Sequence, residues 1–373
     1  MAVTRNKPAP RVRALDDSAA YMAGDPSGMR HRLAGMGEQC REAFRHVRGL
    51  AAVFPAKGPY RAVVVAGMGG SAVGGDLLVG FSESRDATVP IFTWRDYGLP
   101  SWVGQDTLVI VSSNSGETEE ALSAFQSARA RGCDTVALTK GGALSRMAAA
   151  ENVPVMHVPY RGEPRNALGY SVMGPLALLE SAGILSGVAE DVDEAATLLA
   201  SLAGLYGTER PTEENPAKTL ALRARGRLPL FYAAGHLSAV ARRWKTDFNE
   251  NAKCWAFAET LPELDHNTVN GYDLPSFLPA ASLVIFLRSG LLPLRTLRRY
   301  EVTAELLEQS GVEYAVVDAE GDGVLGQIMA TAYLGSWTSY YLGLLHGVDP
   351  SPVPGNEYLK ERMNAAAQPL APA

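Results

Sequence analysis

Residues 112–118 form a loop, Ser-Ser-Asn-Ser-Gly-Glu-Thr, that places four hydroxyl side chains within seven positions. The loop follows an apolar run at residues 107–111 that predicts a buried strand, and it leads into a helical pattern over residues 118–131. Hydroxyl groups and the free amides at a helix N-terminus bind anions, so this arrangement can hold a phosphate group. Helix capping accounts for one or two of the hydroxyls, with Glu119 or Glu120 completing a capping box, but not for all four. We therefore expect a phosphate-binding loop here.

A second loop, residues 67–75, is rich in glycine and follows another predicted strand. Gly67, Gly69 and Ala72 match the dinucleotide-binding pattern GxGxx(G/A). The match is short, and glycine-rich turns also form wherever the backbone must approach a ligand or a sheet closely. Ser71, at the start of the next helical pattern, suits either a ligand contact or a simple helix cap. Nucleotide binding, another ligand contact and plain packing all remain open for this loop.

Acid–base chemistry needs a group that exchanges protons near neutral pH, and histidine does so readily. Of the six histidines, His266 lies in a polar segment that also carries Glu263 and Asp265. The other five fall on predicted helices or a predicted strand, where structural or surface roles are the simpler interpretation: His31, His46, His157, His236 and His346. The histidines have no HxH or HExxH spacing and the three cysteines are far apart, so we expect neither a metal nor another cofactor.

Strands that alternate with helices would position both loops. In the first half, predicted strands cover residues 61–67, 89–94, 107–112, 134–139 and 153–158, and predicted helices cover residues 29–53, 71–81, 118–131 and 143–150. This alternation is typical of a parallel sheet that is covered by helices on both faces. Such sheets bind ligands at the carboxyl edge of their strands, which is where the two loops fall.

The second half repeats the alternation after a helical stretch over residues 171–206 and a polar segment, residues 207–216, that suggests a hinge. Predicted strands follow at residues 228–234, 282–287 and 314–319, and predicted helices at residues 237–250, 294–309, 324–345 and 356–366. The sequence thus predicts an α/β fold with two domains. We expect a disordered arm (residues 1–15), a first domain (16–186), a linking helix and hinge (187–216) and a second domain (217–373).

Composition narrows the class of partner. The 373 residues carry a net charge of −6, from 34 basic and 40 acidic side chains, without a basic run. Nucleic acid binding requires a cationic face, so we expect no nucleic acid partner. No stretch approaches the ~20 apolar residues of a membrane span, and the N-terminus lacks the apolar core of a signal peptide. Widely spaced cysteines fit a reducing compartment, so we expect a soluble cytoplasmic protein with no membrane partner.

The motif Ser113-x-Ser115-Gly116-x-Thr118-x-Glu120 resembles the phosphate loop of sugar isomerase (SIS) domains. Gly67-Met68-Gly69-Gly70-Ser71 is similar to the first ligand loop of the bifunctional phosphoglucose/phosphomannose isomerase branch, and the likeness runs from about Asp16 to Met363. The resemblance implies two SIS domains, each a parallel sheet flanked by helices in three α/β/α layers. It also implies that Ser113, Ser115 and Thr118 hold a sugar phosphate, with further contacts from Gly69, Gly70 and Ser71.

The same resemblance implies an aldose–ketose isomerase that interconverts glucose 6-phosphate or mannose 6-phosphate with fructose 6-phosphate through a cis-enediolate, without a cofactor. The family's general base is a glutamate that matches Glu250, and its ring-opening histidine matches His266. Its oxyanion-stabilising arginine matches Arg165, and a lysine that assists ring opening matches Lys360. Asp265 stands where the family pattern leads us to expect asparagine, a change that could alter the pKa of the neighbouring histidine.

The resemblance further implies a homodimer in which His266 serves the partner subunit's active site. The apolar helices at residues 171–206 and 324–345 are candidates for that interface, although each could equally be core. Ser351 is a candidate for the hydroxyl residue that accompanies activity on both epimers. Two alternatives stay open: each charged candidate could be an ordinary salt-bridge partner, and the chain could be a non-catalytic SIS protein that senses phosphosugars.

Overall fold

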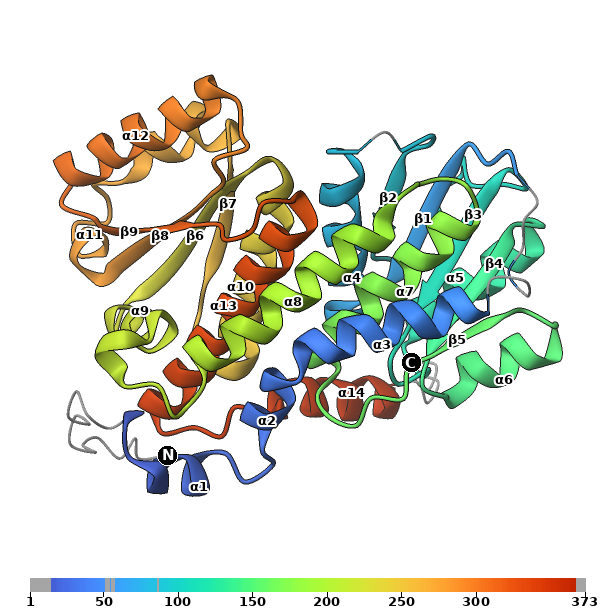
Figure 1. Cartoon of the computed structure of the whole chain (residues 1–373), viewed down its shortest axis with the longest axis horizontal. Helices are drawn as coiled ribbons and strands as arrows, with labels where there is room; N and C mark the ends of the chain where they lie inside the picture. Colours follow the sequence, from blue (N-terminus) through green and yellow to red (C-terminus); the bar gives the residue numbers. More distant parts are fainter. Residues whose placement is uncertain (1–14, 51–53, 55–57, 86, 367–373) are drawn as a thin grey trace, which may run out of the picture.

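Two parallel sheets lie side by side in the computed structural model, which describes residues 15–50, 54, 58–85 and 87–366 (Figure 1). The first sheet has the order β2-β1-β3-β4-β5 and the second has the order β7-β6-β8-β9. Every neighbouring pair of strands is parallel, so each sheet has one edge at which all its strands end. The predicted α/β class is confirmed.

The first sheet is a three-layer unit because alternate residues of its strands enter two separate cores. Its strands are β1 (Ala62–Gly67), β2 (Ile91–Trp94), β3 (Thr107–Ser112), β4 (Asp134–Thr139) and β5 (Val155–His157). Val63 and Val65 face one core and pack with α3 (Met36–Gly49), α4 (Gly69–Ser82) and α7 (Leu168–Ser181). Val64 and Ala66 face the opposite core and pack with α5 (Glu119–Ala130) and α6 (Gly142–Ala150). Strands β1 and β3 are buried along their whole length, which is why their apolar runs predicted them well.

The second sheet is built in the same way. Its strands are β6 (Leu228–Ala234), β7 (Phe257–Leu261), β8 (Ser282–Arg288) and β9 (Glu313–Asp318). One face, with Tyr232 and Phe286, packs on α12 (Leu294–Gln309). The other face, with Phe231 and Ile285, packs on α10 (Ser238–Asn251) and α13 (Val324–His346).

A single core joins the two units. The inner-face residues of both sheets belong to one continuous cluster of buried side chains, together with α8 (Val188–Tyr206) and α13. Helix α13 is buried along nearly its whole length, and in Figure 1 it runs beside α8, with which it is in contact. Helices α13 and α7 are therefore core, and their surfaces are already covered within the chain. For α7 and α13 the alternative that they are core is confirmed. Helix α8, the rest of the 171–206 stretch, has exposed positions along one side, and its place in a dimer interface stays a prediction.

Remaining elements complete the chain. They are α1 (Ser18–Gly24), α2 (Met29–Ala34), η3 (Pro164–Asn166), η4 (Thr212–Glu214), α9 (Pro216–Ala224), η5 (Gly235–Leu237), η6 (Glu263–His266), η7 (Thr268–Gly271), α11 (Leu278–Ala281) and α14 (Pro354–Ala366). Helices α2 and α3 replace the single helix expected at residues 29–53, because Gly35 separates them. The helical stretch at 171–206 is likewise interrupted, where Gly183 and Gly187 adopt positive φ.

The expected hinge at residues 207–216 runs into helix α9, which the sequence did not predict. Asn215 caps that helix, since its Oδ1 accepts hydrogen bonds from the backbone amides of Ala217 (3.0 Å) and Lys218 (3.1 Å). The Lys218 ammonium is fully buried and donates to the carbonyls of Leu15 (2.7 Å) and Thr208 (2.9 Å). The expected arm lies outside the described residues up to position 14, and Leu15 itself is buried. No helix in the described ranges is both long and apolar enough to cross a membrane.

Candidate active site

The hydroxyl-rich loop lies at the carboxyl edge of the first sheet, between β3 and α5. The Ser113 and Thr118 hydroxyls contact each other at 2.9 Å, and Ser113 Oγ accepts a hydrogen bond from the amide of Gly116 at 3.0 Å. Ser115 Oγ accepts from the amide of Glu117 at 3.2 Å, and the side chain of Ser115 is exposed. Thr118 occupies the N-cap position of α5 but makes no side-chain capping bond. The hydroxyls therefore gather around the helix N-terminus without being used up as caps.

Glu117 has a separate role in this loop. Its carboxylate accepts a hydrogen bond from the amide of Ala143 at 2.8 Å, in the first turn of α6. Gly116 lies so close to the next loop that a Cβ there would stand 1.8 Å from the carbonyl oxygen of Gly141. A capping box with Glu119 or Glu120 requires the N-cap side chain to accept a hydrogen bond from a backbone amide of the helix. The Thr118 side chain accepts none in this described helix, so the expected capping box is incomplete. The hydroxyl-rich loop is thus supported by the N-terminus of α6.

The glycine-rich loop meets the hydroxyl loop through Ser71. Helix α4 begins at Gly69, with Met68 as its N-cap residue, so Ser71 lies inside the first turn and is not the cap. Its Oγ accepts a hydrogen bond from the amide of Asn114 at 3.2 Å. A Cβ on Gly70 would stand 3.0 Å from the Cα of Arg165, so only glycine allows that approach without displacement.

A small pocket adjoins these two loops, lined by Ser71, Ser112, Asn114, Tyr170 and Ser171 among others. The side-chain oxygen and nitrogen of Asn114 are both buried there without a protein partner. Buried amides of this kind are usually satisfied by an ordered water or a ligand group.

Arg165 brings the first unit into contact with the second. Its guanidinium is 3% exposed and donates from Nε to Asn251 Oδ1 at 2.6 Å and from Nη1 to Glu250 Oε2 at 3.1 Å. Its Nη2 donates to the carbonyls of Pro350 at 2.7 Å and Ser351 at 3.0 Å. The Glu250 side chain keeps 28% of its surface exposed, so it remains accessible while paired. The structure therefore brings Arg165 and Glu250 together beside the glycine-rich loop.

Lys253 lies one turn beyond Glu250 and adopts a φ of 53°, which is rare for a residue other than glycine. It is exposed overall, but its ammonium donates to the carbonyl of Glu250 and to that of Pro350 at 3.0 Å. Loss of water around the ammonium, together with the positive charge of Arg165, lowers the pKa of Lys253 to about 8. No pattern in the sequence singled out this residue.

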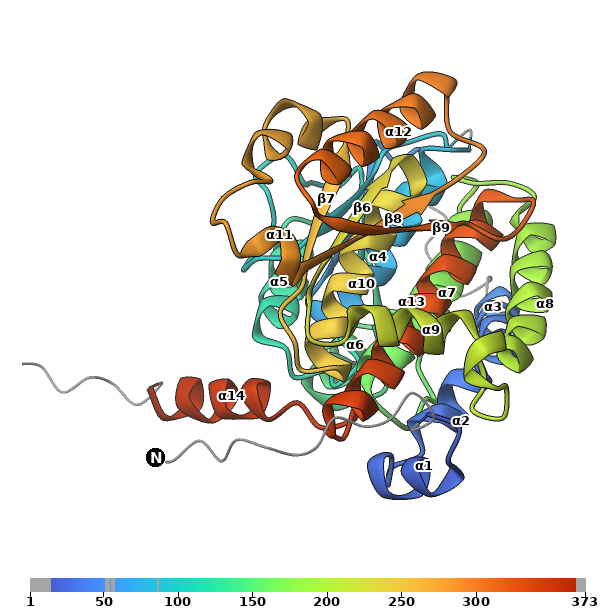
Figure 2. The ribbon, with the colours of Figure 1, turned by 90° about the vertical axis from the view of Figure 1, so that its left-hand side faces the viewer.

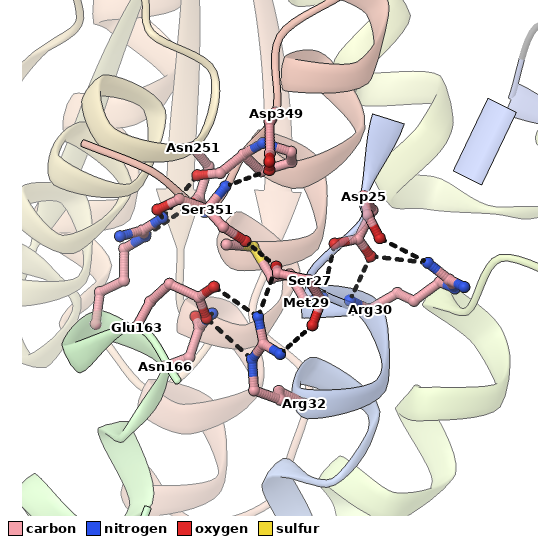
Figure 3. A network of polar contacts seen from close by, with 12 residues as sticks. Asp25, Ser27, Met29, Arg30, Arg32, Glu163, Asn166, Asn251, Asp349 and Ser351 are labelled. Atoms are coloured by element: carbon pink, nitrogen blue, oxygen red, sulfur yellow. Dashed lines mark hydrogen bonds and ion pairs between the residues drawn. The ribbon is translucent and has the colours of Figure 1, made fainter. Parts of the chain in front are cut away.

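The segment before α14 is tied to the N-terminal helices by a polar network that Figure 3 shows. Arg32 on α2 donates to Glu163 Oε2 at 3.0 Å and to Ser27 Oγ at 3.0 Å. The Ser27 hydroxyl in turn contacts that of Ser351. The Ser351 hydroxyl is therefore engaged with the N-terminal segment, while its carbonyl supports Arg165. We name residues 349–351 the strap, because they connect Arg165 to the N-terminal segment that carries Ser27.

His266 stands apart from the site just described. It is exposed in η6, and within the described ranges no hydrogen bond or ion pair joins it to Glu250. Its neighbour Asp265 is anchored to α12, accepting from Arg299 Nη1 at 2.6 Å and from Thr303 Oγ1 at 3.0 Å. The carboxylate that replaces the expected asparagine thus faces α12.

Lys360 is also remote. Helix α14 projects away from the rest of the chain in Figure 2, and residues 354–363 are exposed. Tyr358, Leu359 and Met363 on this helix are all large, exposed apolar side chains. Of the acid–base candidates, the described chain therefore joins Arg165 and Glu250 and leaves His266 and Lys360 separate.

Two further buried polar residues of α10 were not predicted from the sequence. Arg243 and Asp247 are both buried, and they recur with Glu250 and Asn251 at the spacing of successive helical turns. A polar stripe on the buried face of a helix was the available signal. In the described ranges no group of three or more histidine, cysteine or acidic side chains could hold a metal ion.

Known proteins share the fold of this chain and part of its sequence. Residues 213–363 match the family model of the bacterial phospho-glucose isomerase C-terminal SIS domain. A crystal structure of a hypothetical protein from Thermus thermophilus superimposes with a TM-score of 0.76 at 18% identity, covering 96% of this chain and 94% of that one. Fold and family model together place the chain among SIS-domain proteins.

Curated relatives are more specific. A bifunctional phosphoglucose/phosphomannose isomerase from Caldicellulosiruptor bescii is 36% identical over 304 residues, which are 81% of this chain and 89% of the relative. A relative with the same name from Aquifex aeolicus is 33% identical over 309 residues, 83% of this chain and 92% of that protein. The chain belongs to the bifunctional phosphoglucose/phosphomannose isomerase family.

Proposed function

We propose that this chain is an aldose–ketose isomerase that interconverts glucose 6-phosphate, mannose 6-phosphate or both with fructose 6-phosphate. The observation that carries the proposal is the Arg165–Glu250 contact of 3.1 Å beside the two ligand loops. A base and a fixed cation at one point suit a proton transfer that generates an enediolate.

In the proposed mechanism, Ser113, Ser115 and Thr118 hold the phosphate, with the N-terminus of α5 and Ser71 beside them. In the open-chain aldose, Glu250 removes the proton from C2 and negative charge develops on O1, near Arg165. The hydroxyl proton of O2 then passes to O1, and Glu250 returns its proton to C1, which leaves the ketone at C2. His266 and Lys360 are proposed to open the sugar ring.

The Glu250→Gln variant tests the reaction. Loss of a general base typically costs about 10²–10⁴-fold in rate, so we expect kcat to fall by that factor. Binding of fructose 6-phosphate, measured by calorimetry, should change little because the phosphate loop is untouched. Tight phosphosugar binding by an unaltered chain that turns nothing over would instead favour the sensing alternative. Coupled assays with glucose 6-phosphate and mannose 6-phosphate, each with and without a chelator, define the substrate and test the expected metal independence.

We also propose a homodimer with shared active sites, located in the cytoplasm. The exposed position of His266, away from Glu250, supports a role in a second copy of the chain. Mixing Glu250→Gln chains with His266→Ala chains should then restore part of the activity, because one site of each mixed dimer regains both groups. Failure of the mixture to recover, while mixed dimers are demonstrably present, would mean that each chain completes its own site.

A further inference from the structure

Arg243 and Asp247 form an ion pair in the interior, outside the groups used in the proposed mechanism. Both side chains lie on α10, one turn apart, with Arg243 Nη2 2.9 Å from Asp247 Oδ1. Their side chains are 1% and 0% exposed, respectively. Asp247 Oδ2 also accepts a hydrogen bond from Ser336 on α13 at 2.8 Å. The pair is therefore enclosed and fixed from two helices.

Arg243 also reaches across to the first unit. Its Nη2 donates to the backbone carbonyl of Arg165 at 2.7 Å. Two further residues of α10, Glu250 and Asn251, accept from the guanidinium of the same Arg165. Helix α10 thus holds Arg165 at both ends, at the peptide and at the tip of the side chain.

A contribution to the stability of the fold does not by itself explain why a charged pair occupies this buried position. Burying two charges costs solvation energy, and apolar residues of similar volume often replace a buried pair with little loss of stability. Removing one partner is different, because it leaves an uncompensated charge in the interior. What apolar replacements cannot supply is a donor to the Arg165 carbonyl.

We propose that Arg243, oriented by Asp247, is a positioning residue that fixes the Arg165 peptide so that the guanidinium stands against Glu250 and the developing enediolate. The inference rests on the proposed function and deepens it. In this role the buried pair sets the distance between Arg165, which comes from the first unit, and Glu250, which comes from the second.

The test separates stability from positioning. The single variant Arg243→Met should lose both thermal stability and kcat, because Asp247 is left unpaired. The double variant Arg243→Met/Asp247→Leu removes both charges, so we expect the Tm to recover. Its kcat should stay about 10²-fold below that of the unaltered chain, with KM little changed, because displacement of a catalytic group by about 1 Å costs that much. A double variant with recovered Tm and unaltered kcat overturns the proposal.

A matched control uses Lys218, a second buried cation outside the proposed site. Lys218 is fully buried and hydrogen-bonded to backbone carbonyls, but it lies away from the site. Lys218→Met should lower the Tm without changing kcat. If the double variant does not fold, Arg243→Lys decides, because it keeps a charge against Asp247 but lacks the guanidinium fork. Its kcat must then fall at least about tenfold, and an unchanged kcat overturns the proposal.

Binding measurements distinguish this inference from the proposed function. If the unaltered chain does not isomerise sugar phosphates, the proposed function fails. The positioning role is then tested with a phosphorylated aldonate, whose carboxylate resembles the enediolate, and with inorganic phosphate. The double variant should weaken aldonate binding about tenfold and leave phosphate binding unchanged; equal effects on both, or none on either, contradict the role of Arg243.

Discussion

At Arg165, four oxygen atoms surround one guanidinium: those of Asn251, Glu250, Pro350 and Ser351. A cation held in this way needs little rearrangement when negative charge develops beside it. Such preorganisation of charged groups is the main source of electrostatic stabilisation in enzymes. The Glu250 carboxylate shares that environment and keeps part of its surface open to a ligand. Arg165 is therefore held in place by its partners, whereas Glu250 remains accessible to a ligand.

Glu163 gives a prediction at the same scale. Burial alone would raise the pKa of its carboxyl, but hydrogen bonds from Ser351 and Arg32 outweigh burial and hold the pKa below the ordinary value of 4.5. A lowered carboxyl pKa stabilises the fold fully above the unfolded value, and that contribution is lost as pH falls through the folded value. Glu163→Gln should therefore reduce the free energy of unfolding by about 1–3 kcal/mol at pH 7 and by less at about pH 3.5.

Urea unfolding at the two pH values measures this difference. Glu38→Gln is the control, because Glu38 pairs with Arg45 on the surface, where both side chains are largely exposed. Such surface pairs contribute about 0–1 kcal/mol, so its variant should stay close to the unaltered chain. A Glu163 variant that loses the same free energy at both pH values would show that the carboxylate charge is not what stabilises the strap.

Among the elements, the hydroxyl loop depends on one glycine. Gly116 has a φ of 71°, and an added Cβ would stand 1.8 Å from the carbonyl oxygen of Gly141. Gly116→Ala should therefore displace the loop and raise the KM for glucose 6-phosphate, in addition to the ~1–2 kcal/mol cost of a left-handed alanine. Steady-state kinetics and thermal unfolding measure the two effects.

Gly183→Ala is the matched control for this substitution. Gly183 has a φ of 69°, but a Cβ there would meet no atom within 4 Å. Its variant should lose stability without any change in KM. If both variants change KM equally, the close approach of the two loops does not matter for binding.

Elements buried on both faces were the ones that the sequence predicted well. Strand β1 and the inner residues of β3 are continuous apolar runs because both faces of these strands are covered by packed helices. Strand β7 was missed because it is an edge strand with only Leu261 fully buried, so its residues carry no clear pattern. Helix α9 was missed because its polar approach, with Pro211 and Pro216, resembled a hinge.

The site was predictable only in part, for a related reason. The loops that follow β1 and β3 could be placed at a common edge by topology alone, whereas the Arg165–Glu250 contact joins residues from different units. Spacing along the chain does not encode such a contact. The same holds for the Arg243 donor to the Arg165 carbonyl, which depends on how α10 crosses η3.

For the whole molecule, exposed aromatic residues bear on the proposed homodimer. Trp255 is 79% exposed and Phe257 is 46% exposed, and their ring centroids are 6.2 Å apart. Trp255 lies in the connection between α10 and the edge strand β7, and Phe257 is the first residue of β7. The segment that carries His266 continues from the same edge strand. We therefore expect Trp255→Ser/Phe257→Ser to weaken self-association, measured by analytical ultracentrifugation.

A comparable aromatic pair at the other sheet serves as its control. Phe92 on the edge strand β2 and Trp102 are 44% and 51% exposed, with ring centroids 5.1 Å apart. Serine at both positions removes similar apolar surface from the other sheet. Equal dissociation by the two double variants would show that the β7 edge is not the specific contact.

Helix α13 lies at the centre of the core, yet it follows every strand of both sheets in the chain. Both sheets are complete in sequence by Asp318, before the first residue of α13 at Val324. Until that helix leaves the ribosome, the faces of α10 and α8 that pack on it have no partner and remain open to water. Until α13 emerges, a nascent chain of this protein therefore exposes the apolar surface that this helix will cover, and chaperones that recognise such surface would act on it at that stage.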